Sequence, residues 1–103
     1  MGALGRHQEA ADLHQQTLTD RERVLGPDHP ATLTSRNDLA VALGALGRHQ
    51  EAADLHQQTL TSRERVLGTD HPDTLSSRNS LVLVRATAAR SQRGRRPWRR
   101  TRP

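Results

Sequence analysis

Apolar and small residues recur along this chain at spacings of three and four, which is the periodicity of one face of an α-helix. One such set runs through the segment 51–67 and comprises Ala52, Leu55, Thr59, Leu60, Val66 and Leu67. The same set recurs 42 residues earlier as Ala10, Leu13, Thr17, Leu18, Val24 and Leu25. A second set runs through the segment 33–46 and comprises Leu33, Leu39, Ala40, Leu43 and Leu46. The sequence contains no period-two alternation of the kind that indicates a half-buried strand. The pattern therefore predicts helices and no sheet.

Glycine and proline separate these helical segments. The segments 26–30 and 68–72 each combine a glycine that can end one helix with a proline that can begin the next. Gly47 marks a further turn just before Arg48. From these signals we expect helices at about residues 6–25, 31–46 and 48–67, and a last helix from about residue 73.

The chain contains an internal duplication. Residues 3–44 and 45–86 align without a gap and are identical at 32 of 42 positions. Two antiparallel helices cannot bury their apolar stripes alone, whereas stacked copies bury them against each other. The predicted fold is therefore an all-α, antiparallel helix-turn-helix solenoid of about two 42-residue repeats. Because roughly three repeats are usually needed for stability, we expect marginal stability alone or self-association through the exposed ends.

Composition limits the core and the chemistry of this chain. Of 103 residues, 32% are hydrophobic, and Cys, Phe and Tyr are absent, so that the core must consist of Leu, Val and Ala. Without Cys the chain has no disulfides or thiolate sites, which fits a reducing compartment. The chain has neither an apolar run of about 18 residues nor the pattern of a signal peptide. We therefore expect a cytoplasmic protein that does not enter membranes.

The repeated sequence also resembles a known family. The string RNDLAVALGALGRHQEAADLHQQTL, followed by RERVLG, DHP and TL, resembles the tetratricopeptide repeat of the kinesin light chain type. The resemblance covers residues 3 to about 84 and implies that Leu39, Ala40, Leu43, Ala52 and Leu60 are packing positions. Such repeats occur in longer arrays, and we interpret this chain as derived from one.

Two departures from the family pattern concern packing. His49 and His56 stand where the family usually has large aromatic residues, which thins the core. In the last copy Val82, Arg85 and Ala89 replace the Ala, Leu and Gly of the preceding copy, so that the final helix has lost part of its packing pattern.

The family resemblance implies a scaffold or adaptor that binds a protein or peptide through the concave face of the array. By that resemblance the face comprises Thr34, Asn37, Asp38, Val41, Ser76, Asn79, Ser80 and Leu83. Asn37 and Asn79 are the strongest candidates because an amide side chain offers a donor and an acceptor to a peptide backbone. The alternative interpretation is that these are ordinary solvated helix residues.

The sequence offers no clear catalytic or metal site. The histidines of the long helices lie seven residues apart, whereas two imidazoles that share a metal ion on one helix lie four apart. Asp28 and His29 recur in both copies as residues of a helix start, and no cofactor motif stands out. We therefore expect no enzyme, cofactor or metal. The charged stretch 21–23 and its copy 63–65 are interpreted as solvated faces.

The last residues differ in composition from the repeats. Residues 1–86 carry 9 Arg against 11 acidic residues, whereas residues 90–103 carry 7 Arg and no acid. We therefore divide the chain into a repeat region, 1–88, and an Arg-rich tail, 89–103, which we expect to be disordered. One alternative function is non-specific binding of RNA or DNA by this tail. The residues concerned are Arg93, Arg95, Arg96, Trp98, Arg99 and Arg100. The other interpretations are an accidental extension from a GC-rich reading frame and a plain solubilising or targeting tail.

Overall fold

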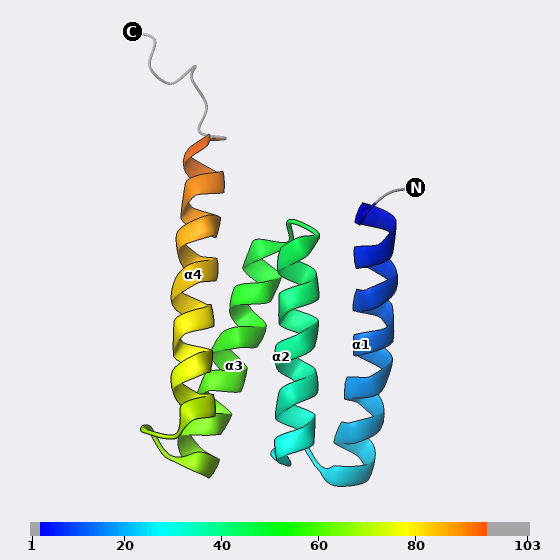
Figure 1. Ribbon diagram of the computed structural model, residues 1–103, viewed down its shortest axis with the longest axis vertical. Helices are drawn as coiled ribbons and strands as arrows, with labels where there is room; N and C mark the ends of the chain where they lie inside the picture. The colour runs from blue at the N-terminus through cyan, green and yellow to red at the C-terminus, as the bar shows by residue number, and fades with distance from the viewer. Residues whose placement is uncertain (1–2, 95–103) are drawn as a thin grey trace, which may run out of the picture.

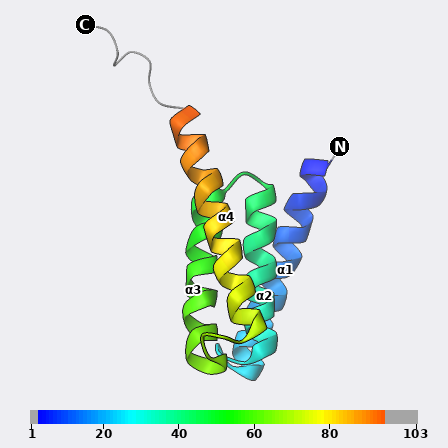
Figure 2. The same ribbon diagram turned by 60° about the vertical axis from the view of Figure 1, so that its left-hand side comes forward.

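The computed structural model describes residues 3–94, which form four helices. These are α1 (Ala3–Leu25), α2 (Pro30–Ala45), α3 (His49–Leu67) and α4 (Pro72–Gly94). Each helix runs antiparallel to the next, and α1–α2, α2–α3 and α3–α4 pack as neighbours (Figures 1 and 2). The prediction of an all-α array of antiparallel helices is confirmed. The helix α4 continues to Gly94 and so passes residue 88, where we expected the repeat region to end.

The turns between helices use glycine as predicted. Gly26 and Gly68 have φ values of 95° and 97°, and Gly47, in the turn between α2 and α3, has a φ of 84°. These values lie in the left-handed region, which only glycine enters without steric cost. A side chain at any of these positions would strain the turn that brings the next helix back along its neighbour.

Histidine side chains cap the N-terminal ends of α2 and α4, the two helices that follow the long turns. The Nδ1 atom of His29 accepts a hydrogen bond from the backbone N–H of Ala31 at 3.0 Å, and His71 accepts one from Asp73 at the same distance. A helix start has free N–H groups that need acceptors, which Ser, Thr, Asp or Asn most often supply. The structural role of the Asp-His-Pro segments is thus confirmed, with the imidazole as the capping group.

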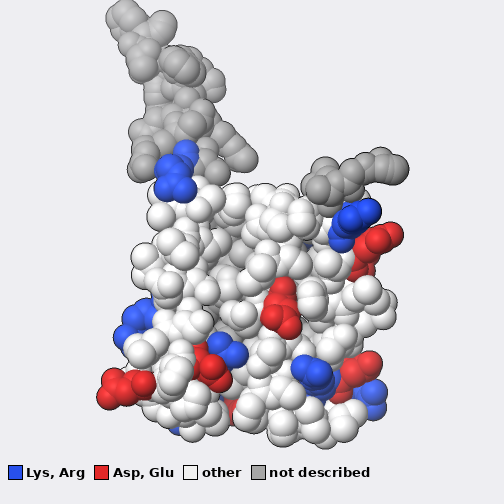
Figure 3. Space-filling model, in the orientation of Figure 1, with Lys and Arg blue, Asp and Glu red and all other residues white. Residues whose placement is uncertain are grey.

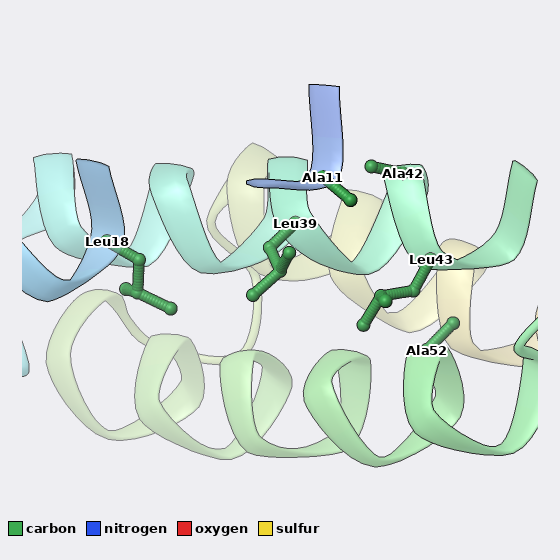
Figure 4. Packing of buried hydrophobic residues seen from close by; sticks show 6 residues of the cluster. All are labelled: Ala11, Leu18, Leu39, Ala42, Leu43 and Ala52. Carbon is green, nitrogen blue, oxygen red and sulfur yellow. The ribbon is translucent and has the colours of Figure 1, made fainter. Parts of the chain in front are cut away.

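The core is a seam of small and aliphatic side chains between neighbouring helices. Leu18, Leu39 and Leu60 are all buried, as the predicted packing requires. Figure 4 shows Leu39 and Leu43 of α2 pointing toward α3, with Ala52 of α3 pointing back toward them. Ala residues at these contacts present only a methyl group, so that neighbouring helices can approach closely.

The ends of the predicted stripes on the long helices are exposed. Val24, Leu25 and Val66 lie on the surface, so their assignment to the buried stripe was wrong. The assignment was also wrong for Leu13 and Thr17 of α1, which are exposed. Val24 follows Leu18 by six residues, which rotates it by about 240° around the helix axis. Arg21, only three residues after Leu18, occupies the inward position in this turn and is half-buried.

Buried arginines join each long helix to the start of the next helix. Arg63 of α3 is buried, and its Nη1 donates hydrogen bonds to the Ser77 hydroxyl at 2.9 Å and to the Asp73 carbonyl at 3.3 Å. The hydroxyl of Thr74 donates in return to the Arg63 carbonyl at 3.3 Å. The interpretation of the stretch 63–65 as a purely solvated face was therefore wrong for Arg63, whose bonds satisfy polar groups inside the interface.

The same set of bonds occurs 42 residues earlier. Arg21 donates to the Ser35 hydroxyl at 2.9 Å and to the Ala31 carbonyl at 3.0 Å, and Thr32 donates to the Arg21 carbonyl at 3.3 Å. The prediction for the stretch 21–23 was therefore also wrong at this residue. The sequence duplication is thus reproduced in the structure as two equivalent polar clamps, one between α1 and α2 and the other between α3 and α4.

Candidate peptide-binding groove

A groove runs between α2 and α4, the two helices that follow the Asp-His-Pro segments. These helices lie side by side, with α3 behind the gap between them (Figures 1 and 2). Side chains of all three helices line the groove, which has a volume of about 280 Å³. Its walls are mainly small and aliphatic, and they include Val41 of α2 and Leu83 of α4. This arrangement can hold a side chain or a short extended segment.

The structure brings three of the eight predicted site residues together in this groove, namely Val41, Ser80 and Leu83. Val41 is 56% exposed and Leu83 is 61% exposed, so that both present apolar surface to solvent across the groove. Ser80 is half-buried between them and adds a hydroxyl group.

The other five predicted residues do not line the groove, and they lie nearer the beginnings of the same two helices. At their spacings of three, four and seven from Val41 and Leu83 they continue the same helix faces by one to two turns. The residues of this group are Thr34, Asn37, Asp38, Ser76 and Asn79. Asn79 is exposed and Asn37 is half-buried, so both amides are within reach of a ligand that extends beyond the groove.

Two histidines of α3 complete the groove. His49 and His56 are seven residues apart and therefore lie on the same side of the helix, two turns apart. Within the described residues, the Nδ1 atom of each is buried and has no hydrogen-bond partner. Leaving a buried polar atom unpaired costs about 1–3 kcal/mol, which a ligand that supplies the partner can recover. The sequence signal for this pair was the replacement of aromatic residues, which we interpreted only as a loss of core packing.

The environment of His56 favours the neutral imidazole. This side chain is only 4% exposed. Burial lowers the pKa of His56 below its ordinary value of 6.5, and the nearby positive charge of Arg63 lowers it further. His56 therefore contributes a neutral polar atom to the groove, not a positive charge.

Charged side chains lie mostly away from the middle of this face. In Figure 3 the arginine and acidic side chains gather near the lower end, where the loops between α1 and α2 and between α3 and α4 lie, and along the edges. The middle is largely uncharged apart from one acidic side chain. An apolar or neutral segment therefore fits this surface better than a polyanion does.

A second groove, of about 390 Å³, lies between α1 and α3 and is more polar. Asp12, Glu22 and Glu51 contribute carboxylates, and Arg48 pairs with Glu51 at 2.7 Å between Nε and Oε1. Sequence reasoning did not find this groove, because its residues come from a pair of helices separated by α2.

The residues of the alternative nucleic-acid site fall at the end of the chain. The backbone of Arg93 belongs to the last turn of α4. The rest of the predicted site lies outside the described residues. It comprises the side chain of Arg93 and all of Arg95, Arg96, Trp98, Arg99 and Arg100. Binding of RNA or DNA by this tail stays a prediction.

Two further findings concern metal binding and membrane spans. Within residues 3–94, no three His, Asp or Glu side chains gather in a way that could hold a metal ion. None of the described helices has the length and apolar character needed to cross a membrane.

A stack of antiparallel helices with equivalent polar clamps 42 residues apart defines a helical repeat protein. The chain matches the tetratricopeptide repeat family over residues 2–65, and it belongs to that family. Repeats of this family generally mediate protein–protein interaction. A comparison with curated proteins gives no match. The family match ends within α3, and α4 is assigned to the repeat by the alignment of residues 45–86 with residues 3–44.

Proposed function

We propose that this chain is a protein-interaction module that holds an extended peptide in the groove between α2 and α4. The observation that carries this proposal is the exposure of Val41 and Leu83 across a groove that also contains two unpartnered imidazole nitrogens. Exposed apolar side chains around polar groups are typical of peptide sites, because the apolar area supplies affinity and the polar groups fix orientation.

The groove suggests a division of labour along the peptide. An apolar peptide side chain would pack against Val41 and Leu83. A peptide N–H group would donate to the Nδ1 atom of His49 or His56 when the imidazole turns toward the groove. Further along the same faces, Asn37 and Asn79 would hold the peptide backbone through their amides. Thr34, Asp38, Ser76 and Ser80 would then contribute to sequence preference.

Finer assignments belong to the same proposal. The two Asp-His-Pro segments support assignment to the kinesin light chain type of repeat. The absence of any evident catalytic motif in the sequence supports a scaffold without enzyme activity, and the cysteine-free composition supports a cytoplasmic location.

A peptide-display selection with the intact chain tests this function. Peptides enriched on the wild-type chain are measured by calorimetry against Leu83→Glu, which places a charge in the groove, and against Val82→Glu as a matched control. Val82 and Leu83 are adjacent and about equally exposed, at 59% and 61%, but only Leu83 lines the groove. With each chain measured at a concentration where it is monomeric, we expect Leu83→Glu to weaken binding by about tenfold or more, equivalent to about 1.4 kcal/mol, and Val82→Glu to leave it unchanged.

The double variant Asn37→Ala, Asn79→Ala examines the amides separately. Loss of two hydrogen bonds to a peptide backbone should weaken binding by several-fold to about a hundredfold, at about 0.5–1.5 kcal/mol each. No enrichment of any peptide, or equal affinities for wild type and Leu83→Glu, would overturn the proposal.

A further inference from the structure

Each terminal helix of the described array has an open face whose copy in the middle of the array is buried. On α4 we call the stripe Leu75, Arg78, Val82 and Arg85 the α4 end face. Its copies 42 residues earlier, Leu33, Arg36, Ala40 and Leu43, are all buried in α2. Leu33 is 0% exposed and Leu75 is 45% exposed, although the residue type is the same. The difference arises because α2 packs extensively against both α1 and α3, whereas the extensive packing of α4 is against α3.

The first helix shows the complementary pattern. On α1 we call the stripe Ala10, Leu13, Thr17 and Asp20 the α1 end face. The copies of Ala10 and Thr17 are Ala52 and Thr59 of α3, which are fully buried. Leu13 is 62% exposed, whereas its copy, Leu55, packs against the main core cluster.

We propose that the α4 end face of one copy of this chain packs against the α1 end face of a second copy, as α2 packs against α3 within each copy. The chain already contains this interface once, between α2 and α3. The two end faces together repeat its eight stripe positions, and five of the eight residues are identical, at positions 10, 13, 17, 75 and 78. The surfaces needed for the contact are therefore present on the two ends of one molecule, which makes a second copy the fitting partner.

The changed positions favour this head-to-tail pairing over pairing of like ends. Asp20 replaces Ser62 on the α1 end face, and Arg85 replaces Leu43 on the α4 end face, so that the two faces gain opposite charges. The whole of α1 carries four acidic residues and three Arg, whereas α4 carries four Arg and one Asp. Pairing α4 with α4 would bring positive charges together, and unlike ends attract.

The replacement of Leu43 by Arg85 has an identifiable partner on the α1 end. Leu43 and Glu51 line the same groove within the chain. Their copies are Arg85 and Glu9, and these two side chains would therefore meet across the junction between two molecules. Arg85 also donates to Gln57 of its own chain at 2.9 Å, which holds its guanidinium beside the end of the array.

In a head-to-tail contact the α4 end face of one copy binds the α1 end face of the other. The pair therefore keeps one free α1 end face and one free α4 end face. Such heterologous contacts add further copies without closing unless the rotation forms a ring. Each junction would also place α2 of the second copy beside α4 of the first, with His7 and His14 of the second copy's α1 in the positions that His49 and His56 hold in α3. The assembly would thus repeat the groove at each junction.

Sedimentation velocity and light scattering on the intact chain test this assembly, independently of any peptide. For the wild type we expect the mean mass to rise above 11.5 kDa with concentration and to continue past twice that value. Val82→Glu on the α4 end face and Thr17→Arg on the α1 end face should each hold the chain at 11.5 kDa. Leu83→Glu, next to Val82 but in the groove, should associate like the wild type. Circular dichroism confirms that each variant is folded.

Mixing the two end-face variants determines the polarity of the contact. Val82→Glu retains an intact α1 end face and Thr17→Arg retains an intact α4 end face, so that an equimolar mixture should give a complex of twice 11.5 kDa that grows no further. Association of either variant alone would indicate pairing of like ends and would overturn the proposal. A wild-type chain that stays monomeric up to about 1 mM, which would put the association free energy weaker than about −4 kcal/mol, would also overturn it.

Discussion

The helices α2 and α4 are copies of one sequence in two different surroundings. The stripe that faces the preceding long helix is buried in both, as in the pairs Thr32 and Thr74 or Ser35 and Ser77. The stripe that would face a following long helix is buried only in α2, where α3 is present. Burial in this fold is therefore decided by the neighbour and not by the residue, which the copied leucines Leu33 and Leu75 demonstrate directly.

The long helices give the cleaner form of the same comparison. Over 23 residues α1 and its copy in the segment 45–67 differ at one position, Asp20 against Ser62. Thr59 is nevertheless buried and Thr17 is exposed. Nearly identical helices thus expose different amounts of apolar surface, and the excess on α1 and α4 is available for association.

The largest effect we predict separates the two copied leucines. Leu33→Ala should lower the free energy of unfolding by about 2–5 kcal/mol, because it removes a fully buried side chain and leaves a cavity. Leu75→Ala should lower it by less than about 1 kcal/mol, since half of that side chain is already in solvent. Urea unfolding followed by circular dichroism, at a concentration where the chain is monomeric, measures both. Equal losses would show that the two surroundings are alike.

The second prediction concerns the two polar clamps. Arg63→Met removes the donor to Ser77 and Asp73 inside a buried interface and should destabilise the fold by about 1–3 kcal/mol. Arg21→Met is the matched variant, and its effect should be smaller because Arg21 is half-buried and water can replace it. The same urea titration compares them, and an Arg63→Met chain as stable as the wild type would contradict the role of the clamp.

The third prediction is a pH dependence that originates at His56. Because its pKa is lower in the folded protein than the ordinary 6.5, the unfolded chain takes up the proton first as the pH falls. The contribution of the neutral His56 imidazole to the free energy of unfolding is therefore complete above pH 6.5. It is lost as the pH falls below that value through the pKa of His56 in the folded protein. His56→Phe should reduce the loss of stability between about pH 7.5 and about pH 5. A loss of stability in His56→Phe equal to that of the wild type would contradict the assignment.

These comparisons also indicate how much the sequence can predict. The helix order, the turns and the buried positions Leu18, Leu39 and Leu60 follow from periodicity, glycine and proline, because these are local signals. Val24 and Val66 were misassigned because a simple list of apolar positions ignores the accumulated rotation of the helix. Arg21 and Arg63 were misassigned because their partners lie on another helix, and composition alone treats arginine as a surface residue.

The groove was predictable only in part for a related reason. Val41, Ser80 and Leu83 could be placed on one face by their repeat position, and they do line the groove. The unpartnered atoms of His49 and His56 depend on how three helices meet, and no spacing along one helix contains that information. Sequence periodicity thus predicts which face is presented, whereas the depth and polarity of the groove depend on the packing of neighbouring helices.

The smallest effect we predict concerns the loop before each copied helix. Arg65 of α3 makes two hydrogen bonds to Asp28, at 2.8 and 3.1 Å, and this contact lowers the pKa of the Asp28 carboxyl below its usual value. Asp70 is the copy of Asp28, and the helix that would carry the corresponding arginine is not among the described residues. At low salt and at a concentration where the chain is monomeric, Asp28→Asn should therefore destabilise the chain slightly, and Asp70→Asn should have no effect. The pair is exposed, so added salt should remove the difference by screening. The difference should also disappear as the pH falls through the folded pKa of Asp28, because protonation then breaks the ion pair in the wild type as well. A difference that persists at high salt would mean that Asp28 acts through the turn geometry and not through Arg65.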